Sequence, residues 1–199
     1  MTHGPAQQLK LACIPPLLFP YIWAAKFSAW QNFTLEKSAR PKTKKVSFTP
    51  AGYHSVTPYL ACGGAARAID FYKAAFGATE VMRMPGPGGR IGHAEVKIGD
   101  SRVMLTDEYA EMNFVGPLSR GGTTVHLHVY VKDVDAMMQR AVAAGGKLVR
   151  EIKDQFYGDR TGALEDPFGH VWHLATHKKD VSMTELRKGA EKRVKEAGG

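Results

Sequence analysis

The same order of predicted elements occurs twice along this chain, and that duplication constrains its fold more than any single motif. Each copy starts with alternating apolar and polar residues, continues with a helical pattern and stops at a glycine. These parts are 55–61, 65–76 and Gly77 in the first copy, and 124–131, 133–144 and Gly145 in the second. Gly77 and Gly145 lie 68 residues apart, so the copies keep register. We predict two similar modules, 54–118 and 122–177.

Three further strands are expected in each copy. They are 79–84, 92–98 and 101–106 in the first copy, and 147–151, 162–165 and 170–176 in the second. A two-residue hairpin turn at Gly99-Asp100 would place Glu95 opposite Met104 on the neighbouring strand. Asp133 is the predicted N-cap of the second helix. Each module is therefore predicted to be a βαβββ unit, and the fold class is α+β.

Charge is concentrated at the two ends of the chain. Residues 1–50 carry seven basic groups and one acidic group, whereas residues 51–176 carry 13 basic and 14 acidic groups. Residues 177–199 carry seven basic and four acidic groups. Nucleic acid binding requires basic groups clustered on the folded surface, so we expect no nucleic-acid partner.

The ends themselves are expected to lie outside the central domain, 51–180. Residues 1–50 are predicted to be a poorly ordered extension, and 181–199 a charged helix behind a capping box of Ser182 and Glu185. The apolar run 11–25 contains three prolines and is too short to span a bilayer, so no membrane partner is expected. It fits either a poor signal peptide or, as we prefer, an irregular extension of a cytoplasmic protein.

Several phrases of the central domain resemble the vicinal oxygen chelate superfamily, which includes glyoxalase I, extradiol dioxygenases and proteins of fosfomycin and bleomycin resistance. The phrases are 56–60 (VTPYL), 70–77 (DFYKAAFG), 93–95 (HAE) and 166–172 (DPFGHVW), and they look closest to the PhnB-like branch. The resemblance implies that tandem βαβββ modules form a curved mixed sheet around a central cleft, with the helices on the outer face. It also implies a homodimer.

Strand alternation assigns the side chains to faces. Apolar residues are expected beneath the helices, and they include Val56, Leu60, Val125, Leu127 and Trp172. Polar residues then line the inner face, where a small-molecule ligand would bind. The expected ligand-binding residues are Thr57, Tyr59, His93, Arg102, Met104, His128 and Tyr130. Their mixture of cationic and imidazole groups favours an anionic or neutral ligand.

Metal-using members of the superfamily hold their ion with one residue on each of four strands. The resemblance carries these positions onto Thr57, Met104, His126 and His173. Threonine and methionine are unusual ligands for Zn, Ni, Mn or Fe ions, so two of the four positions depart from the pattern.

The hairpin offers a replacement ligand. Because Glu95 is expected opposite Met104, its carboxylate could complete a metal site with His126 and His173. Alternatively, Lys97 or Arg102 neutralises Glu95, and hydrogen bonds hold the two histidines.

Two functions stay open at this point. The first is a metal-dependent enzyme, a lyase, isomerase, transferase or dioxygenase that acts on a small oxygen-rich substrate, in which a divalent ion polarises the substrate oxygens. The second is a protein that binds a drug or metabolite without a metal. The sequence identifies no catalytic residue and does not choose among the reactions.

Overall fold

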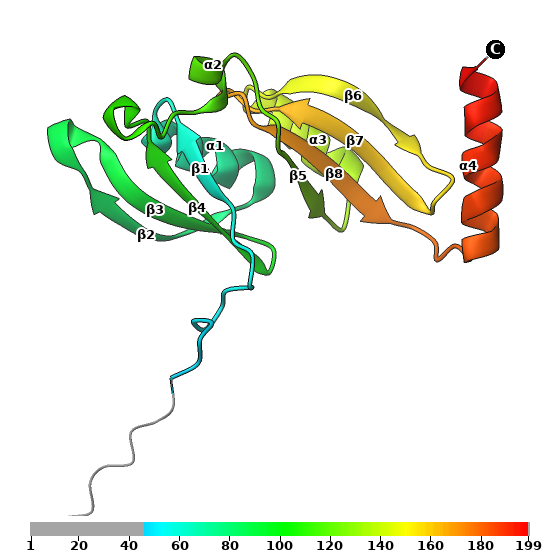
Figure 1. Ribbon diagram of the computed structural model, residues 1–199, viewed down its shortest axis with the longest axis horizontal. Coiled ribbons are helices and arrows are strands. Elements are labelled where there is room, and N and C mark those ends of the chain that lie inside the picture. The colour runs from blue at the N-terminus through cyan, green and yellow to red at the C-terminus, as the bar shows by residue number, and fades with distance from the viewer. Residues whose placement is uncertain (1–45, 199) are drawn as a thin grey trace, which may run out of the picture. The chain divides into compact units, whose positions relative to one another are not determined.

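Two βαβββ modules make up most of the computed structural model, which describes residues 46–198. Figure 1 shows each module as a sheet with one long helix beside it. The first module contains β1 (Tyr59–Cys62), α1 (Ala65–Phe76), β2 (Thr79–Pro85), β3 (Ile91–Ile98) and β4 (Ser101–Asp107). The second contains β5 (His126–Tyr130), α3 (Val134–Ala143), β6 (Lys147–Asp154), β7 (Asp159–Glu165) and β8 (Val171–His177). The predicted α+β class is confirmed.

Each module forms its own four-stranded mixed sheet. The strand orders are β1-β4-β3-β2 and β5-β8-β7-β6, and the first pair in each order is parallel. Glu95 pairs with Met104 across the hairpin, as the two-residue turn predicted. The two modules therefore repeat one topology, with the outer strand β1 or β5 joined to the last strand of its own module.

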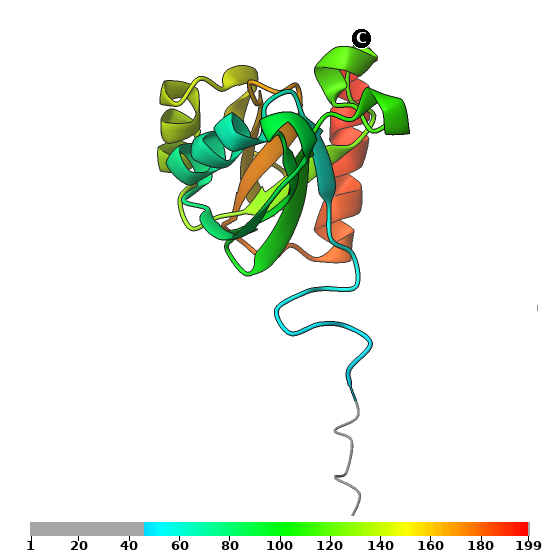
Figure 2. The ribbon, with the colours of Figure 1, turned by 90° about the vertical axis from the view of Figure 1, so that its left-hand side faces the viewer.

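Local sequence signals set the ends of the two long helices. Gly77 ends α1 in the left-handed region with φ of 66°, where a side chain would be strained. The Asp133 carboxylate begins α3 by accepting a hydrogen bond of 3.0 Å from the backbone N–H of Ala136. Helices α1 and α3 pack against each other, and Figure 2 shows them side by side.

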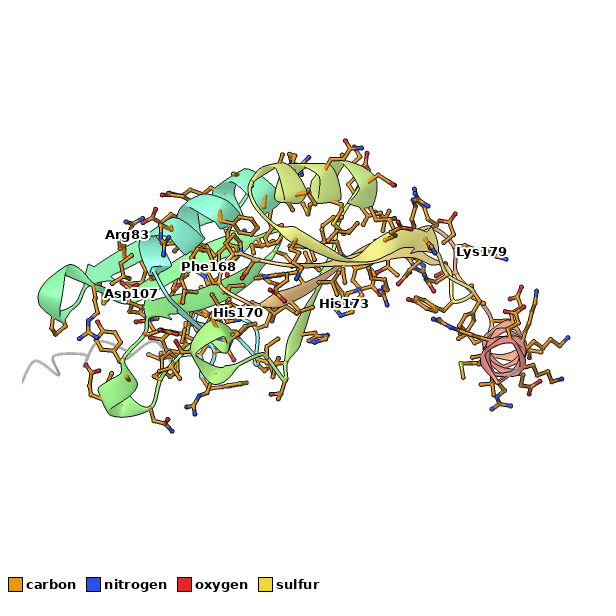
Figure 3. The ribbon with its side chains drawn as sticks, turned by 90° about the horizontal axis from the view of Figure 1, so that it is seen from above. Arg83, Asp107, Phe168, His170, His173 and Lys179 are labelled. Carbon is orange, nitrogen blue, oxygen red and sulfur yellow. The ribbon has the colours of Figure 1, made fainter. Side chains whose placement is uncertain are left out.

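A shared core joins the modules on the helix side of the sheets. The centre of the Trp172 ring, on β8, lies 5.3 Å from the centre of the Tyr72 ring and 4.8 Å from that of the Phe76 ring. Tyr72 and Phe76 both belong to α1. The Asp166 carboxylate, only 3% exposed, accepts hydrogen bonds from the Tyr72 hydroxyl at 2.8 Å and the Trp172 indole at 2.9 Å. This packing leaves the opposite face of each sheet for polar side chains, and Figure 3 shows His173 on the face away from α3.

Two apolar residues that were predicted to lie beneath the helices are exposed. Val56 is 84% exposed because β1 starts only at Tyr59, so Val56 precedes the strand and its alternation does not apply. Val125 is 66% exposed for the same reason, since β5 starts at His126. Leu60 and Trp172 are buried as expected, whereas Leu127 is only partly buried against the core.

Short helices and a C-terminal helix complete the described chain. They are η1 (Pro87–Gly89), η2 (Ala110–Met112), α2 (Pro117–Arg120) and α4 (Met183–Ala197). The capping box of Ser182 and Glu185 is present at the start of α4. Within residues 46–198, no helix is both long and apolar enough to cross a bilayer. The predictions for 11–25 fall outside the described residues, as do nearly all those for 1–50.

Candidate functional site

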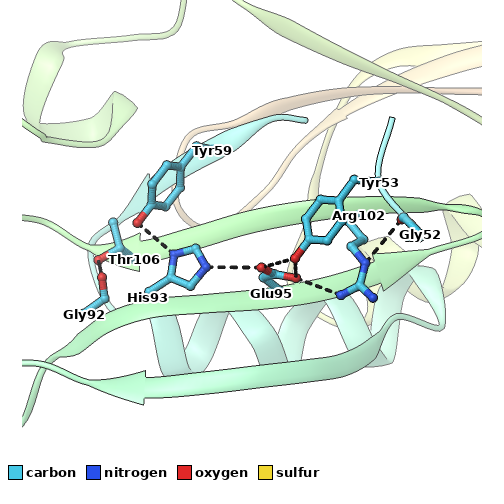
Figure 4. A network of polar contacts seen from close by, with 8 residues as sticks. All are labelled: Gly52, Tyr53, Tyr59, Gly92, His93, Glu95, Arg102 and Thr106. Carbon is cyan, nitrogen blue, oxygen red and sulfur yellow. Dashed lines mark hydrogen bonds and ion pairs between the residues drawn. The ribbon is translucent and has the colours of Figure 1, made fainter. Parts of the chain in front are cut away.

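A chain of polar contacts crosses the inner face of the first sheet (Figure 4). The Tyr59 hydroxyl lies 3.0 Å from Nδ1 of His93, whose Nε2 lies 3.4 Å from Oε1 of Glu95. Arg102 donates from Nη1 to Oε2 of Glu95 at 2.8 Å. The Tyr53 hydroxyl reaches both carboxylate oxygens, at 2.5 and 2.6 Å. Glu95 is thus enclosed by three polar side chains and is only 3% exposed.

These neighbours keep Glu95 ionised. Burial by itself raises the pKa of a carboxyl group, but the hydrogen bonds from Tyr53, His93 and Arg102 and the positive charge of Arg102 outweigh it. The pKa of Glu95 therefore lies below its ordinary value. The sequence left two roles open for Glu95, a metal ligand or a carboxylate neutralised by Lys97 or Arg102. The contacts described here match the second role, with Arg102 as the partner.

A histidine cluster occupies the inner face of the second sheet. Nδ1 of His126 lies 3.0 Å from Nε2 of His173, so one ring donates a hydrogen bond and the other accepts it. The His128 and His173 rings are nearly parallel, with their centres 6.2 Å apart. The centre of the His128 ring lies 4.8 Å from that of the Tyr130 ring. Burial, and then the nearby charge of Arg150, lower the pKa of His173, which favours the neutral imidazole.

A cavity of about 450 Å³ lies between the β3–β4 hairpin and β5, and we call it the hairpin cavity. Arg102, His128 and Tyr130, three of the predicted ligand-binding residues, line it together. Leu127, Val129 and Trp172 also line the hairpin cavity, so its walls combine apolar surface with a few polar groups. Such a mixture is typical of sites for small organic molecules.

The predicted metal ligands do not come together within one chain. His126 and His173 meet, but Glu95 lies on the other sheet and bonds with Tyr53 and Arg102. Among residues 46–198, no group of three or more His, Cys, Asp or Glu side chains is placed to hold one ion. Two imidazoles with a guanidinium 3.3 Å from one of them are a poor donor set for a divalent cation.

Two other predicted ligand-binding residues, Thr57 and Met104, do not line the hairpin cavity. Thr57 precedes β1, and its hydroxyl lies 3.4 Å from the carbonyl oxygen of His54. Met104 lies between Tyr59 and Glu95 in the first sheet. Sequence reasoning missed Tyr53 because it precedes the repeated pattern, with no periodic signal to place it on the sheet.

Arg150 was also missed, for a different reason. It lies in β6 beyond a register irregularity, where simple alternation fails to assign the face, and its Nη2 lies 3.3 Å from Nδ1 of His173. The β6 strand also runs to Asp154 rather than ending at residue 151.

Comparisons with known proteins agree with this architecture. The Mycobacterium bovis protein Mb0911c is 44% identical over 136 residues, which are 67% of this chain and 90% of that protein. The crystal structure of TioX from Micromonospora sp. ML1 has a TM-score of 0.50 with 28% identity, covering 65% of this chain and 99% of TioX. A glyoxalase-related enzyme from Fulvimarina pelagi has a TM-score of 0.51 with 26% identity, covering 62% and 87% of the two chains.

A family model matches the same region. The model of the Glyoxalase/Bleomycin resistance protein/Dioxygenase superfamily covers residues 52–174, which include the first βαβββ module and the second as far as the middle of β8. On this match and the paired topology of its two sheets, the chain belongs to the glyoxalase/bleomycin resistance protein/dioxygenase superfamily.

Proposed function

We propose that this protein binds a small anionic or neutral organic molecule in the hairpin cavity. One observation carries the proposal: the polar groups of this cavity have unused hydrogen-bonding capacity. Within residues 46–198, neither Nη2 of Arg102 nor the His128 ring has a hydrogen-bond partner. A ligand that brings acceptor oxygens would satisfy both groups.

The surrounding contacts hold Arg102 ready for such a ligand. Its Nη1 donates to Glu95, its Nε donates to the carbonyl oxygen of Gly52 at 3.3 Å, and its guanidinium lies 4.5 Å from the centre of the Tyr53 ring. The side chain is therefore fixed before the ligand arrives, which lowers the entropic cost of binding. Because Glu95 already balances the charge of Arg102, the cavity suits neutral as well as anionic ligands.

The size and the walls of the cavity suit a metabolite rather than a macromolecule. Its volume of about 450 Å³ falls within the range of roughly 300–1,000 Å³ that is usual for small-molecule sites. The side chains of Leu127, Val129 and Trp172 would contact the apolar part of the ligand. Tyr130 is held by a hydrogen bond of 2.9 Å from its hydroxyl to Asp159, so its ring is fixed at the edge.

Thermal-shift screening of the full chain against small carboxylates, phosphates and neutral metabolites tests this proposal, followed by calorimetry on any hit. We expect His128→Ala and Arg102→Lys to weaken the binding of an anionic hit by about tenfold or more, because each loses a charge-assisted or polar contact. Lys97→Ala is the matched control, since Lys97 pairs with Arg102 in the hairpin but does not line the cavity. Equal affinity of the three variants and the natural chain would contradict the proposal.

Metal-dependent catalysis is a second candidate function, and the contact between His126 and His173 is the observation that favours it. One chain offers these two nitrogen donors without a carboxylate beside them, so the donor set is incomplete and no reaction step is derived from it. Within residues 46–198 no third His, Cys, Asp or Glu joins this pair, so a third ligand would have to come from a second copy of the chain.

Elemental analysis of protein purified without added metal tests the second candidate. The natural chain is compared with a Glu95→Ala/His126→Ala double variant, and a site for Zn, Ni, Mn or Fe predicts metal only in the natural chain. Equal and negligible metal in both proteins would remove this candidate and leave metal-independent binding. The reaction type, whether lyase, isomerase, transferase or dioxygenase, would then have no support.

We also propose three narrower properties of this protein. The PhnB-like branch is supported by the phrases quoted above, whereas the PhnB protein from Bacillus cereus, at 21% identity, shows a likeness of fold alone. A homodimer is supported by exposed apolar side chains that line neither the hairpin cavity nor the aromatic pocket described below, such as Leu118 and Val125. A cytoplasmic location can be tested by fractionating cells that produce the tagged full chain.

A further inference from the structure

A second cavity, lined mainly by aromatic and other apolar side chains, lies at the β2–β3 end of the first sheet. It has a volume of about 540 Å³ and shares no lining residue with the hairpin cavity. We call it the aromatic pocket, and its principal walls are Tyr59, Tyr109, Met112 and Phe114. Three of these four side chains are aromatic and the fourth is a thioether, so the walls favour π contacts and sulfur–aromatic contacts.

The floor of the aromatic pocket offers little that would bind a polar group. Gly92 has no side chain, and the Thr106 hydroxyl lies 2.9 Å from the backbone oxygens of both Ile91 and Gly92. Thr106 is only 2% exposed, so its hydroxyl is already used by the protein. A ligand in this pocket therefore gains mainly from contact with the walls.

The wall that carries Tyr109, Met112 and Phe114 is built before any ligand arrives. Backbone hydrogen bonds of 2.8 and 3.1 Å join Tyr109 and Phe114, which closes the loop between them. The Arg90 guanidinium lies 4.0 Å from the centre of the Tyr109 ring and donates to the carbonyl oxygen of Glu108 at 3.1 Å. Arg90 directly follows the glycine-rich segment 85–89, so the loop is attached to the end of that segment and the pocket is preformed.

The glycine-rich segment shows how closely Tyr109 is packed. A Cβ atom at Gly86 would lie 2.2 Å from the Tyr109 hydroxyl, so only glycine fits there. The Tyr109 hydroxyl is buried and has no hydrogen-bond partner within the described residues. Burying a hydroxyl without a partner costs free energy, which the folded chain tolerates at this position.

Charge at the rim selects against an ionic ligand. Glu111 lines the pocket, but Nη2 of Arg90 lies 3.1 Å from its carboxylate, so the two charges balance. Met112 is 66% exposed and Tyr59 is 45% exposed, which leaves apolar surface that the rest of the described chain does not cover. The Tyr59 ring packs against two other rings, with its centre 5.2 Å from that of Phe114 and 5.3 Å from that of His93.

We infer that the aromatic pocket is a binding site for an uncharged planar aromatic group, separate from the hairpin cavity. Flat rings contact aromatic walls over a larger area than a puckered ring of the same carbon skeleton and add favourable electrostatic contacts at the ring edges. The pocket should therefore prefer an aromatic compound to its saturated counterpart. This inference goes beyond the proposed function, because it concerns a different cavity and a different chemical class of ligand.

The test uses the full chain, with 2-naphthol as the aromatic probe and decahydro-2-naphthol as its saturated counterpart. Calorimetry should show that 2-naphthol binds about fivefold or more tightly than the saturated alcohol. With ¹³C-methyl-labelled methionine, the Met112 methyl signal should shift on addition of 2-naphthol. Phe114→Ala and Met112→Ala should weaken its binding by about tenfold and about threefold, respectively.

Met183→Ala is the matched control, since Met183 is also 66% exposed but lies on α4, away from the pocket. It should leave the affinity for 2-naphthol unchanged. No binding of 2-naphthol by the natural chain, no preference over the saturated alcohol, or equal effects of Met112→Ala and Met183→Ala would overturn the inference. Because the Met112 side chain is exposed, the Met112→Ala variant should still fold, and its affinity can be compared with that of the natural chain. The proposed function is tested with different variants, which change the hairpin cavity. The proposed function and this inference can therefore fail independently.

Discussion

At the scale of single residues, a few buried polar groups connect the two modules. Asp166 is the main one, because its carboxylate accepts from the Tyr72 hydroxyl, the Trp172 indole and the backbone N–H groups of Phe168 and His170, all within 2.9 Å. Two of these donors are side chains on different modules. The Asp166 side chain therefore ties the turn before β8 to helix α1.

Replacing this carboxylate should be costly. Asp166→Ala leaves four buried donors without their acceptor, so we expect the free energy of unfolding to fall by about 3 kcal/mol or more. Tyr72→Phe removes a single hydrogen bond and should cost about 1 kcal/mol. Urea unfolding of both variants checks this order. A loss for Asp166→Ala no larger than that for Tyr72→Phe would contradict the role of Asp166.

His177 makes stability depend on pH near neutrality. Hydrogen bonds to Asp159 at 2.7 Å and Asp180 at 3.0 Å raise the pKa of its imidazole above the ordinary value of 6.5. A raised folded-state pKa adds stability that is fully present below pH 6.5 and is lost as the pH rises through the folded-state pKa. The melting temperature of His177→Gln should therefore fall below that of the natural chain at about pH 5.5 and approach it at about pH 9.

Direct titration separates this effect from a change in packing. The imidazole signals of His177 should give an NMR titration midpoint above 6.5 in the natural chain. A midpoint at or below that value, or a difference in melting temperature that grows with pH, would show that the two aspartates do not stabilise the imidazolium.

At the scale of elements, glycine positions decide where the helices stop. Gly77 follows α1 with φ of 66°, and a Cβ atom built there meets nothing within 4 Å. A substitution is therefore free of steric overlap, and its cost comes only from the left-handed backbone. Gly77→Ala should lower the free energy of unfolding by about 1 kcal/mol, and Gly77→Asn by less, because asparagine tolerates this conformation better. Equal losses measured by urea unfolding would argue against this reason.

Helix α4 has few contacts with the modules. Its side chains are exposed or partly exposed, and the Phe156 ring packs against it at Gly189, where a Cβ atom would lie 2.4 Å from the ring. A chain truncated after Val181 should keep the melting temperature within about 2 °C, since little apolar surface is lost. It should also bind 2-naphthol as the full chain does. A large fall in melting temperature would show that α4 stabilises the modules.

At the scale of the whole molecule, the inner faces of the two sheets carry different chemistry. Within residues 46–198, the side chains of one inner face make no hydrogen bond or ion pair with those of the other, and the modules connect through α1, α3 and the Asp166 network. Exposed apolar side chains outside both cavities, such as Leu118 and Val125, leave surface that a second copy would cover. Light scattering should give a mass twice that of the 21.8 kDa chain. A monomer at micromolar concentration would contradict the proposed homodimer.

The sequence by itself determined the features that depend on neighbours along the chain. Helix α1 begins and ends where the apolar spacing and Gly77 predicted, α3 begins at its Asp133 cap, and the two-residue turn fixed the pairing of Glu95 with Met104. Each of these follows from backbone geometry over a few residues. Because the same order of elements occurs twice, the sequence predicted two βαβββ modules.

Only the tertiary structure decided the surroundings of the candidate site residues. Tyr53 covers Glu95 across 42 positions of sequence, and Nε2 of His170 lies 3.1 Å from the carbonyl oxygen of Ala61 across 109 positions. Strand alternation places a side chain on a face, but the partner that it meets there depends on how distant segments pack. That is why the pattern gathered Glu95 with His126 and His173, whereas in one folded chain packing separates the carboxylate from the histidines.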